Sequence, residues 1–313
     1  METIVRNIDY GSRRVPWGGL GTDISHSGCI DEALFQAGLD WEVTQKPLQT
    51  VEEVPVPLTG YWANVRVQDN EPLGIVTDRY RVIQNSEAFG FVDSLIGEGV
   101  TFQQAGQFQN GRKVWVLAKL PDRYVLADEA VSPYVVFITS HDGSSSVKVA
   151  MTPVRVICCN MINLALRRAS RTWSAQHTGD ISLKLDDARD TLLHAGEYMD
   201  ALGNEIGNLH LLKLTDSQVI SLADKIYPEA PEMTDLQKRN AGMKRQDLLE
   251  RYFLAPDLSI LPRNAFRFIQ AVSDHATHSD PARRGANYNE NLFARSIEGN
   301  PLIDRAYALV KAV

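Results

Sequence analysis

The sequence predicts an α+β fold, in which an antiparallel sheet built from hairpins carries covering helices and is followed by an all-α C-terminal segment. Three pairs of strand-like runs are each joined by a short turn, and a tight turn makes its two strands antiparallel. The turns are Asp69-Asn70, Asn110-Gly111 and Asp142-Gly143. Helical patterns lie between the hairpins, which indicates that helices cover one face of the sheet. Beyond residue 178 only helical patterns remain.

Length and composition are typical of a globular protein with one large domain or two. The chain has 313 residues, of which 44% are hydrophobic and 23% are charged. We divide it into an N-terminal arm with a short helix over residues 1–40 and an antiparallel α+β core over residues 41–178. A helical region over residues 179–313 is expected to pack on this core.

Two features predict a cytoplasmic protein of the host cell without a membrane partner. No apolar run approaches about 18 residues, the minimum for a membrane-spanning helix. The first residues, METIVRNIDYGSRR, lack the apolar core of a secretion signal. The three cysteines, Cys29, Cys158 and Cys159, lack zinc-site spacing, and we expect them to be small buried core residues.

The N-terminal segment predicts an arm, a helix and an extended stretch. Trp17–Gly21 is glycine-rich but lacks the spacing of a phosphate-binding loop. We expect an extended arm whose Trp17 docks on the body or on a partner. Ser27–Leu39 has helical periodicity with Ser27 as a candidate cap, and Trp41–Val56 is expected to be extended.

Alternating apolar and polar residues predict the next two hairpins. Tyr61–Val67 alternates cleanly, and together with Leu73–Ile83 it makes a hairpin. Asn85 is a candidate cap for a helix over Ser86–Ile96. Asn-Gly is the strongest short hairpin signal, and it joins the strands predicted at Thr101–Gln109 and Lys113–Leu120.

The centre of the chain predicts a hairpin followed by a basic amphipathic helix. Tyr134–Ser140 and Ser146–Cys159 read as two strands, and the period becomes helical from Asn160. At 100° per residue the two sides of this helix separate. The apolar side has Cys158, Ile162, Ala165, Leu166, Ala169 and Trp173, and the polar side has Asn160, Asn163, Arg167, Ser170, Arg171 and Ser174.

Local positive charge at this hairpin and helix predicts an anionic ligand. Between His141 and Thr178 five cations stand against Asp142 alone, so the local balance is 5 − 1 = +4 in a chain of net charge −7. The acidic total argues against a protein that coats duplex DNA through diffuse charge, but it allows a focused groove.

Five helices are expected in the C-terminal region, separated by prolines. Ser217 and Thr234 are candidate caps for the second and third of these helices. The predicted helices are Ile181–Leu209, Thr215–Ile226, Thr234–Arg251, Arg263–Ala276 and Asn289–Val313.

Several segments together resemble a known family. They are Thr152–Leu166 (TPVRVICCNMINLAL), Trp17–Gly21, Gly38–Trp41 and Asn287–Ala294. The chain resembles the phage/plasmid-like protein family, the domain of unknown function 932. Its most specific motif surrounds Arg155, Cys158 and Asn160, where the usual Asn-Thr is Asn160-Met161 in this sequence. The resemblance implies a gene carried by a phage, prophage or plasmid, and it implies no proven chemistry.

We therefore expect a nucleic-acid-binding protein, with single-stranded DNA binding or annealing in replication or recombination as its role. A sheet crossed by a helix with a basic groove is similar to the single-strand annealing superfamily, an analogy at the level of the fold. Cations follow the nucleic-acid backbone in such proteins. Annealing proteins usually assemble, so we expect a homo-oligomer. The candidate binding residues are Lys148, Arg155, Asn160, Asn163, Arg167, Arg168 and Arg171.

Two other functions stay open. An enzyme acting on nucleic acid or nucleotides would use the turn Ser140–Ser144, where a histidine, a carboxylate and hydroxyls meet, but Asp142 before glycine is better explained by turn chemistry. We therefore assign no catalytic residue. His275, His278 and Asp280 suggest a metal site, but Pro281 favours a frayed helix end, and we expect no metal or cofactor.

A phage factor that engages a host protein is the third hypothesis. Charged C-terminal helices would supply its surface, although such faces are usually only solvated. The residues concerned are Lys238, Arg239, Lys244, Arg245 and Arg251.

Overall fold

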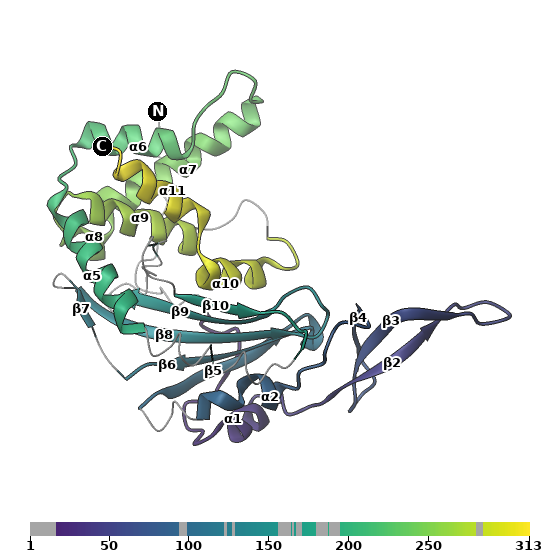
Figure 1. Cartoon of the computed structure of the whole chain (residues 1–313). Helices are drawn as coiled ribbons and strands as arrows, with labels where there is room; N and C mark the ends of the chain where they lie inside the picture. The colour runs from purple at the N-terminus through teal and green to yellow at the C-terminus, as the bar shows by residue number, and fades with distance from the viewer. Residues whose placement is uncertain are drawn as a thin grey trace.

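Two antiparallel sheets and two sets of helices make up the protein (Figure 1). A computed structural model describes residues 17–93, 99–121, 124–126, 129–155, 164, 166, 171–179, 187, 195–279 and 284–313. All strand pairs in it are antiparallel, and only helices follow the last described strand in the chain. The predicted α+β class is therefore confirmed.

The large sheet has the strand order β1-β5-β6-β8-β9-β10, and β7 pairs with β8 beside this path. The predicted Asn110-Gly111 and Asp142-Gly143 hairpins are confirmed as its central pairs, β5–β6 and β8–β9. The strands are β1 (Thr22–Asp23), β5 (Thr101–Phe108), β6 (Lys113–Lys119), β7 (Tyr124–Leu126), β8 (Glu129–Ser140), β9 (Val147–Arg155) and β10 (Thr172–Ala175).

Helices cover both faces of this sheet, where the sequence predicted one covered face (Figure 1). The side chains of β6 alternate between two hydrophobic clusters, as the pleat requires. Val114, Val116 and Ala118 pack toward α1 (Ile30–Gln36) and α2 (Asn85–Phe89). Trp115 and Leu117 pack toward α10 (Tyr288–Glu298). A second covering layer explains why β6 is an unbroken apolar run.

Glycine makes room for the largest side chain of this core. A Cβ at Gly106 would lie 2.8 Å from the Trp115 ring, and one at Gly21 would lie 2.8 Å from the same ring. Trp17, at the start of the described chain, is buried in the same cluster with its ring centroid 5.2 Å from that of Tyr134. The expected docking of Trp17 therefore takes place on the body of its own chain.

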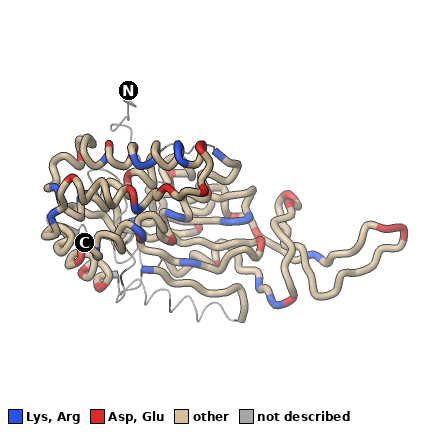
Figure 2. Tube along the Cα trace, turned by 90° about the horizontal axis from the view of Figure 1, so that it is seen from above, with Lys and Arg blue, Asp and Glu red and all other residues tan. Residues whose placement is uncertain are grey.

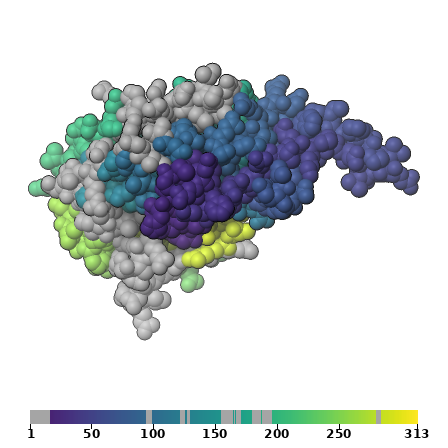
Figure 3. Space-filling model, turned by 90° about the horizontal axis from the view of Figure 1, so that it is seen from below, coloured from purple at the N-terminus to yellow at the C-terminus, as the bar shows by residue number. Residues whose placement is uncertain are grey.

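The small sheet projects from the body as an arm (Figures 1 and 3). It consists of β2 (Val43–Gln49), β3 (Pro57–Arg66) and β4 (Pro72–Thr77), in this order. The predicted Asp69-Asn70 hairpin is confirmed as β3–β4, with Asn70 at a φ of 59°. Acidic residues mark the outer end of the arm in Figure 2.

Buried polar side chains join the small sheet to the large sheet. His141 Nε2 donates to Asn85 Oδ1 at 2.9 Å, and Asn64 Nδ2 donates to the His141 carbonyl at 2.7 Å. Gly74 of β4 lies so close to the turn after β8 that a Cβ there would be 2.5 Å from Asp142 Cα. Asn85 is not the predicted helix cap, because it lies inside α2 and its amide donates to the Leu39 carbonyl.

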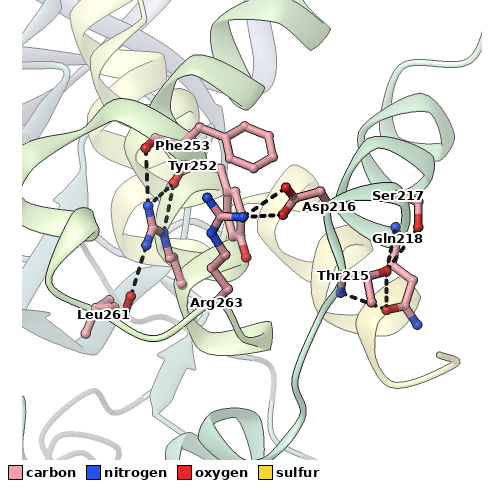
Figure 4. Close-up of polar contacts among 9 residues, drawn as sticks. Thr215, Asp216, Ser217, Gln218, Tyr252, Phe253, Leu261 and Arg263 are labelled. Carbon is pink, nitrogen blue, oxygen red and sulfur yellow. Dashed lines mark hydrogen bonds and ion pairs between the residues drawn. The ribbon is translucent and has the colours of Figure 1, made fainter.

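The C-terminal helices pack around α9, which is buried along most of its length. Thr234 caps α7 with a capping box, as predicted. The cap of α6 is Thr215 and not Ser217, whose hydroxyl lies 3.1 Å from that of Thr215 (Figure 4). The helices are α5 (Ala195–Leu211), α6 (Asp216–Ile226), α7 (Asp235–Leu254), α8 (Pro256–Ser259), α9 (Ala265–His278) and α11 (Pro301–Val310).

Four local predictions are wrong for identifiable reasons. The helix predicted over Asn289–Val313 is two helices, because Gly299 takes a φ of 124° and Pro301 starts α11. The basic helix cannot extend to Ser174, because Thr172–Ala175 is a strand paired with β9. Cys29 is exposed, and it occupies the cap position of α1 that Ser27 was expected to fill. Cys158 and Cys159 lie outside the described residues.

Within the part of the chain that the structure describes, no helix is both long and apolar enough to cross a membrane.

We predict that His141 makes folding sensitive to mild acid. Burial lowers the pKa of His141 to about 3 from 6.5, helped by nearby His177 and opposed by Asp142. Below pH 6.5 the unfolded chain therefore binds a proton at His141 that the folded protein does not bind. The unfolding free energy consequently decreases as the pH falls from 6.5 toward 3. The loss approaches about 1.4 kcal/mol per pH unit.

Urea unfolding of the wild type and of His141→Gln at several values between pH 7 and pH 4 measures this loss. The variant should show a flatter dependence of unfolding free energy on pH, since the other titrating groups are common to both proteins. Parallel curves would contradict the assignment.

Candidate functional site

The two sequence-predicted site residues whose side chains are described both contact α10. Lys148 on β9 forms an ion pair with Glu298 at the end of α10. Arg171 precedes β10, and its Nη1 donates to the Met151 carbonyl at 3.1 Å and to the Ile297 carbonyl. Burial lowers the pKa of Arg171, partly offset by Tyr198 and by acidic neighbours. These two cations therefore fasten α10 to the sheet.

The other predicted site residues are not placed. Arg155 ends β9, and its side chain lies outside the described atoms. Asn160, Asn163, Arg167 and Arg168 lie outside the described residues. Their role in binding stays a prediction.

Glutamates near both ends of α10 face lysines of the large sheet. Glu290 pairs with Lys113 of β6 at 2.7 Å, while Glu298 pairs with Lys148. Eight residues of helix separate the two carboxylates by about 12 Å, so they reach two different strands. One side of α10 is thereby committed to the sheet, and Phe293 and Ile297 add apolar contacts.

The opposite side of α10 lines a cavity of about 770 Å³. The cavity lies among α7, α9, α10, the start of α11 and the segment before α10, and its volume falls within the usual range of ligand sites, about 300–1,000 Å³. Lys244 of α7 and Arg295 of α10 supply cations to its wall, with amides and aromatic rings beside them. Further lining residues are Tyr227, Asn240, Asp247, His275, Asn287, Tyr288 and Asn291.

Lys244 and Arg295 are available to a ligand. Both side chains are exposed, and within the described part of the chain neither forms an ion pair with a carboxylate. Lys244 Nζ lies 5.6 Å from the centroid of the Tyr227 ring. By contrast, the next residue, Arg245, is bound to Asp224 and Glu229. Charges of both signs otherwise alternate over the helical layer in Figure 2.

A series of hydrogen bonds runs from the cavity wall into the helical core. The Tyr227 hydroxyl lies 2.8 Å from His275 Nε2, and His275 Nδ1 lies 2.5 Å from Asp247 Oδ2. The same carboxylate oxygen accepts from Ser279 Oγ and, at 3.0 Å, from Arg251 Nε. Because an ionised carboxylate only accepts, His275 Nδ1 donates to Asp247, and in the neutral imidazole Nε2 is then the acceptor for the phenol.

Two pKa values in this series are displaced. Burial alone would raise the pKa of Asp247, but hydrogen bonds from His275, Arg251 and Ser279 hold it well below its usual value. Asp247 is therefore ionised at neutral pH. Burial raises the pKa of Tyr227 to about 12, and the Asp247 charge adds to the effect. The phenol is consequently protonated and donates to His275.

The turn considered for catalysis has structural roles in the described atoms. His141 is buried at the joint between the sheets, and the Asp142 carboxylate accepts from the Ser144 amide at 2.9 Å, as turn chemistry requires. Ser140 Oγ donates to the Ser145 carbonyl. Within the described residues, His141 Nε2 binds Asn85 and Nδ1 is buried without a hydrogen-bond partner, so no hydroxyl of this turn forms a hydrogen bond with the ring.

The histidine suggested as a metal ligand has other partners in the structure. His275 is engaged on both ring nitrogens by Asp247 and Tyr227, and Asp280 lies outside the described residues. Among the residues that are described, no group of three His, Cys, Asp or Glu side chains could hold a metal ion.

Sequence reasoning missed most of the cavity. Lys244 was noted for a partner surface and His275 for a metal, but Tyr227, Asp247 and Arg295 were not singled out as site residues. They come from separate helices, so no local spacing relates them. The available signal was the polar run Gly285–Asn291, of which Asn287 and Asn291 line the cavity.

We predict that Arg171 and Lys148 contribute unequally to stability. Arg171→Ala leaves two buried carbonyl groups without a charged donor and should lower the unfolding free energy by about 2–3 kcal/mol. Lys148→Ala removes a partly exposed ion pair and should cost less than about 1 kcal/mol. Urea denaturation of both variants measures the difference. Equal losses of unfolding free energy would contradict the larger role assigned to Arg171 in holding α10 to the sheet.

Comparison with known proteins identifies the family. No curated protein and no solved structure matches the chain. The family model described as "Domain of unknown function (DUF932)" matches residues 72–297, which span β4 through nearly all of α10. The matched segment is well over half of the chain and includes most of the residues that line the cavity. The chain belongs to the DUF932 family.

Proposed function

We propose that this is a phage- or plasmid-encoded nucleic-acid-binding protein whose ligand is single-stranded nucleic acid, in replication or recombination. The observation that carries the proposal is the cavity with Lys244 and Arg295 on its wall and no carboxylate paired with either in the described chain. A mobile-element origin is what the resemblance to the phage/plasmid-like proteins implies.

The cavity offers the three kinds of group that a nucleotide needs. The two cations suit phosphate groups, and the amides of Asn240, Asn287 and Asn291 can donate to and accept from base edges. The ring of Tyr288 offers a stacking surface, and the Arg284 guanidinium lies 5.5 Å from its centroid. This combination favours a nucleotide over an inorganic anion.

The shape of the site favours a single strand. A recess bounded by helices can admit an unpaired nucleotide, whereas the bases of a duplex are stacked in its interior and are not free to enter. The net charge of −7 also opposes diffuse attraction to duplex DNA. A focused pair of cations is compatible with an acidic protein.

The basic segment after β9 remains part of the proposal. Arg155, Asn160, Asn163, Arg167 and Arg168 precede Arg171, which contacts the sheet side of α10. These residues would form a second contact region for a nucleic-acid strand that extends beyond the cavity. We keep both regions because single-stranded nucleic acid is a linear ligand of several nucleotides.

Self-assembly and a cytoplasmic setting also stay predictions. Of the two docking places predicted for Trp17, the body and a partner, the body is the one observed, so Trp17 does not support an oligomer. The native mass of the purified protein, with and without an oligonucleotide, measures assembly directly.

We predict that Lys244→Ala and Arg295→Ala each weaken binding of a labelled single-stranded oligonucleotide about tenfold, equal to about 1.4 kcal/mol. Each should reduce the slope of log K against log salt by about 0.7, the value for one phosphate contact on a single strand. Fluorescence polarisation at several salt concentrations measures both quantities.

Arg239→Ala is the matched control, because it removes the same charge from an exposed position of α7 that does not line the cavity. A joint Arg167→Ala and Arg168→Ala variant tests the second contact region. If that variant loses binding while Lys244→Ala and Arg295→Ala retain it, the cavity is not the contact site. Absence of binding at low salt with micromolar protein would reject the proposed function.

A further inference from the structure

A phenol, an imidazole and a carboxylate at the cavity wall stand in the order of a nucleophile, its base and the group that orients the base. Tyr227 Oη to His275 Nε2 is 2.8 Å, and His275 Nδ1 to Asp247 Oδ2 is 2.5 Å. Both distances lie within the reach required for proton transfer. The arrangement follows the general logic of an activated nucleophile, with tyrosine in the place that serine or cysteine takes elsewhere.

The orienting carboxylate is itself held from several sides. Arg251 Nε and Ser279 Oγ donate to the oxygen of Asp247 that accepts from His275. Arg251 is fixed in turn by Asp274 at 2.6 Å. The rings of Tyr227 and His275 meet edge to face, with centroids 5.6 Å apart and an interplanar angle of 72°. The imidazole therefore has one orientation, and Nε2 is directed at the phenol.

The position of this series beside two available cations distinguishes it from a simple structural contact. Tyr227 comes at the end of α6 and lines the cavity, and Lys244 lies over its ring. Arg295 lines the same cavity from α10. A phosphodiester bound by these cations would lie next to the phenol, and the cations would offset the charge that develops on phosphorus oxygens during attack.

We propose that Tyr227 is the nucleophile of a phosphodiester-transfer reaction on the nucleic acid bound in the cavity. This activity rests on the proposed function above. Tyr227 Oη forms a bond to phosphorus, its proton passes to His275 Nε2, and the bond from phosphorus to one ester oxygen breaks. The leaving oxygen keeps the electron pair and takes the proton from His275. The products are a phosphotyrosyl-linked strand and a strand with a free hydroxyl group.

Burial raises the pKa of Tyr227 to about 12, which means that the phenol requires a base to become a nucleophile. His275 is the group in place to serve as that base. Asp247 is a positioning residue, because it contacts the imidazole and not the phenol.

The experiment uses the full-length protein and single-stranded oligonucleotides that carry a bridging phosphorothiolate, with sulfur replacing either the 5′ or the 3′ ester oxygen. Cleavage at sulfur releases a thiol that returns poorly to phosphorus, so the covalent adduct accumulates. Denaturing gels detect the adduct, and peptide mass spectrometry locates it. Polarisation with the same oligonucleotides measures binding separately.

The wild type should bind and give an adduct on Tyr227 with one of the two probes. Tyr227→Phe keeps the ring and should bind within about twofold, with adduct reduced at least about 100-fold. His275→Gln should slow adduct formation by a similar factor while binding persists. Tyr61→Phe changes an exposed tyrosine of β3 that does not line the cavity, and it should form adduct as the wild type does.

Binding by the wild type without adduct from either probe would overturn the nucleophile and leave the proposed function standing. Undiminished adduct in folded Tyr227→Phe would overturn it as well. Absence of binding would reject the proposed function together with this activity. Thermal unfolding of each variant verifies that a lost adduct does not reflect a lost fold.

Discussion

The helical region depends on the pairing of charges that α9 carries into the interior. Asp274 is fully buried, and an isolated charge at such depth would cost several kcal/mol. Arg251 compensates the buried negative charge by forming ion pairs with both Asp274 and Asp247, and Asp247 in turn binds His275. The pairing requires α7 and α9 to lie side by side in one register. Tyr227 extends the same series to α6, so three helices are held by one set of polar contacts.

The same constraint explains why a polar series ends at a cavity. The buried members are paired with one another, and Tyr227, His275 and Asp247 also line the cavity. A structural network alone would be satisfied without Lys244 and Arg295 nearby. Their presence on the same wall is what gives the site its chemical character.

The helix α10 connects the two halves of the molecule. Its glutamates and apolar side chains bind the sheet, while Tyr288, Asn291 and Arg295 line the cavity. Lys148 and Arg171, which the sequence predicts as ligand contacts, bind the sheet side of this helix. The cavity lies on the opposite side of the same helix, so local charge in the sequence and the cavity are related through α10.

Sequence alone determined the class of fold and most of its hairpins, because turn chemistry and alternation are local. Asn110 and Gly111 adopt the positive φ angles that such turns require, and Thr234 caps α7 as predicted. Only the tertiary structure decided which face of each element is used. Asn85 became a partner of His141, Thr172–Ala175 became a strand paired with β9, and Lys148 of the central hairpin paired with Glu298, far along the chain. Tyr227, Asp247, His275 and Arg295 come together by helix packing, and contacts between distant segments leave no periodic trace in a single sequence.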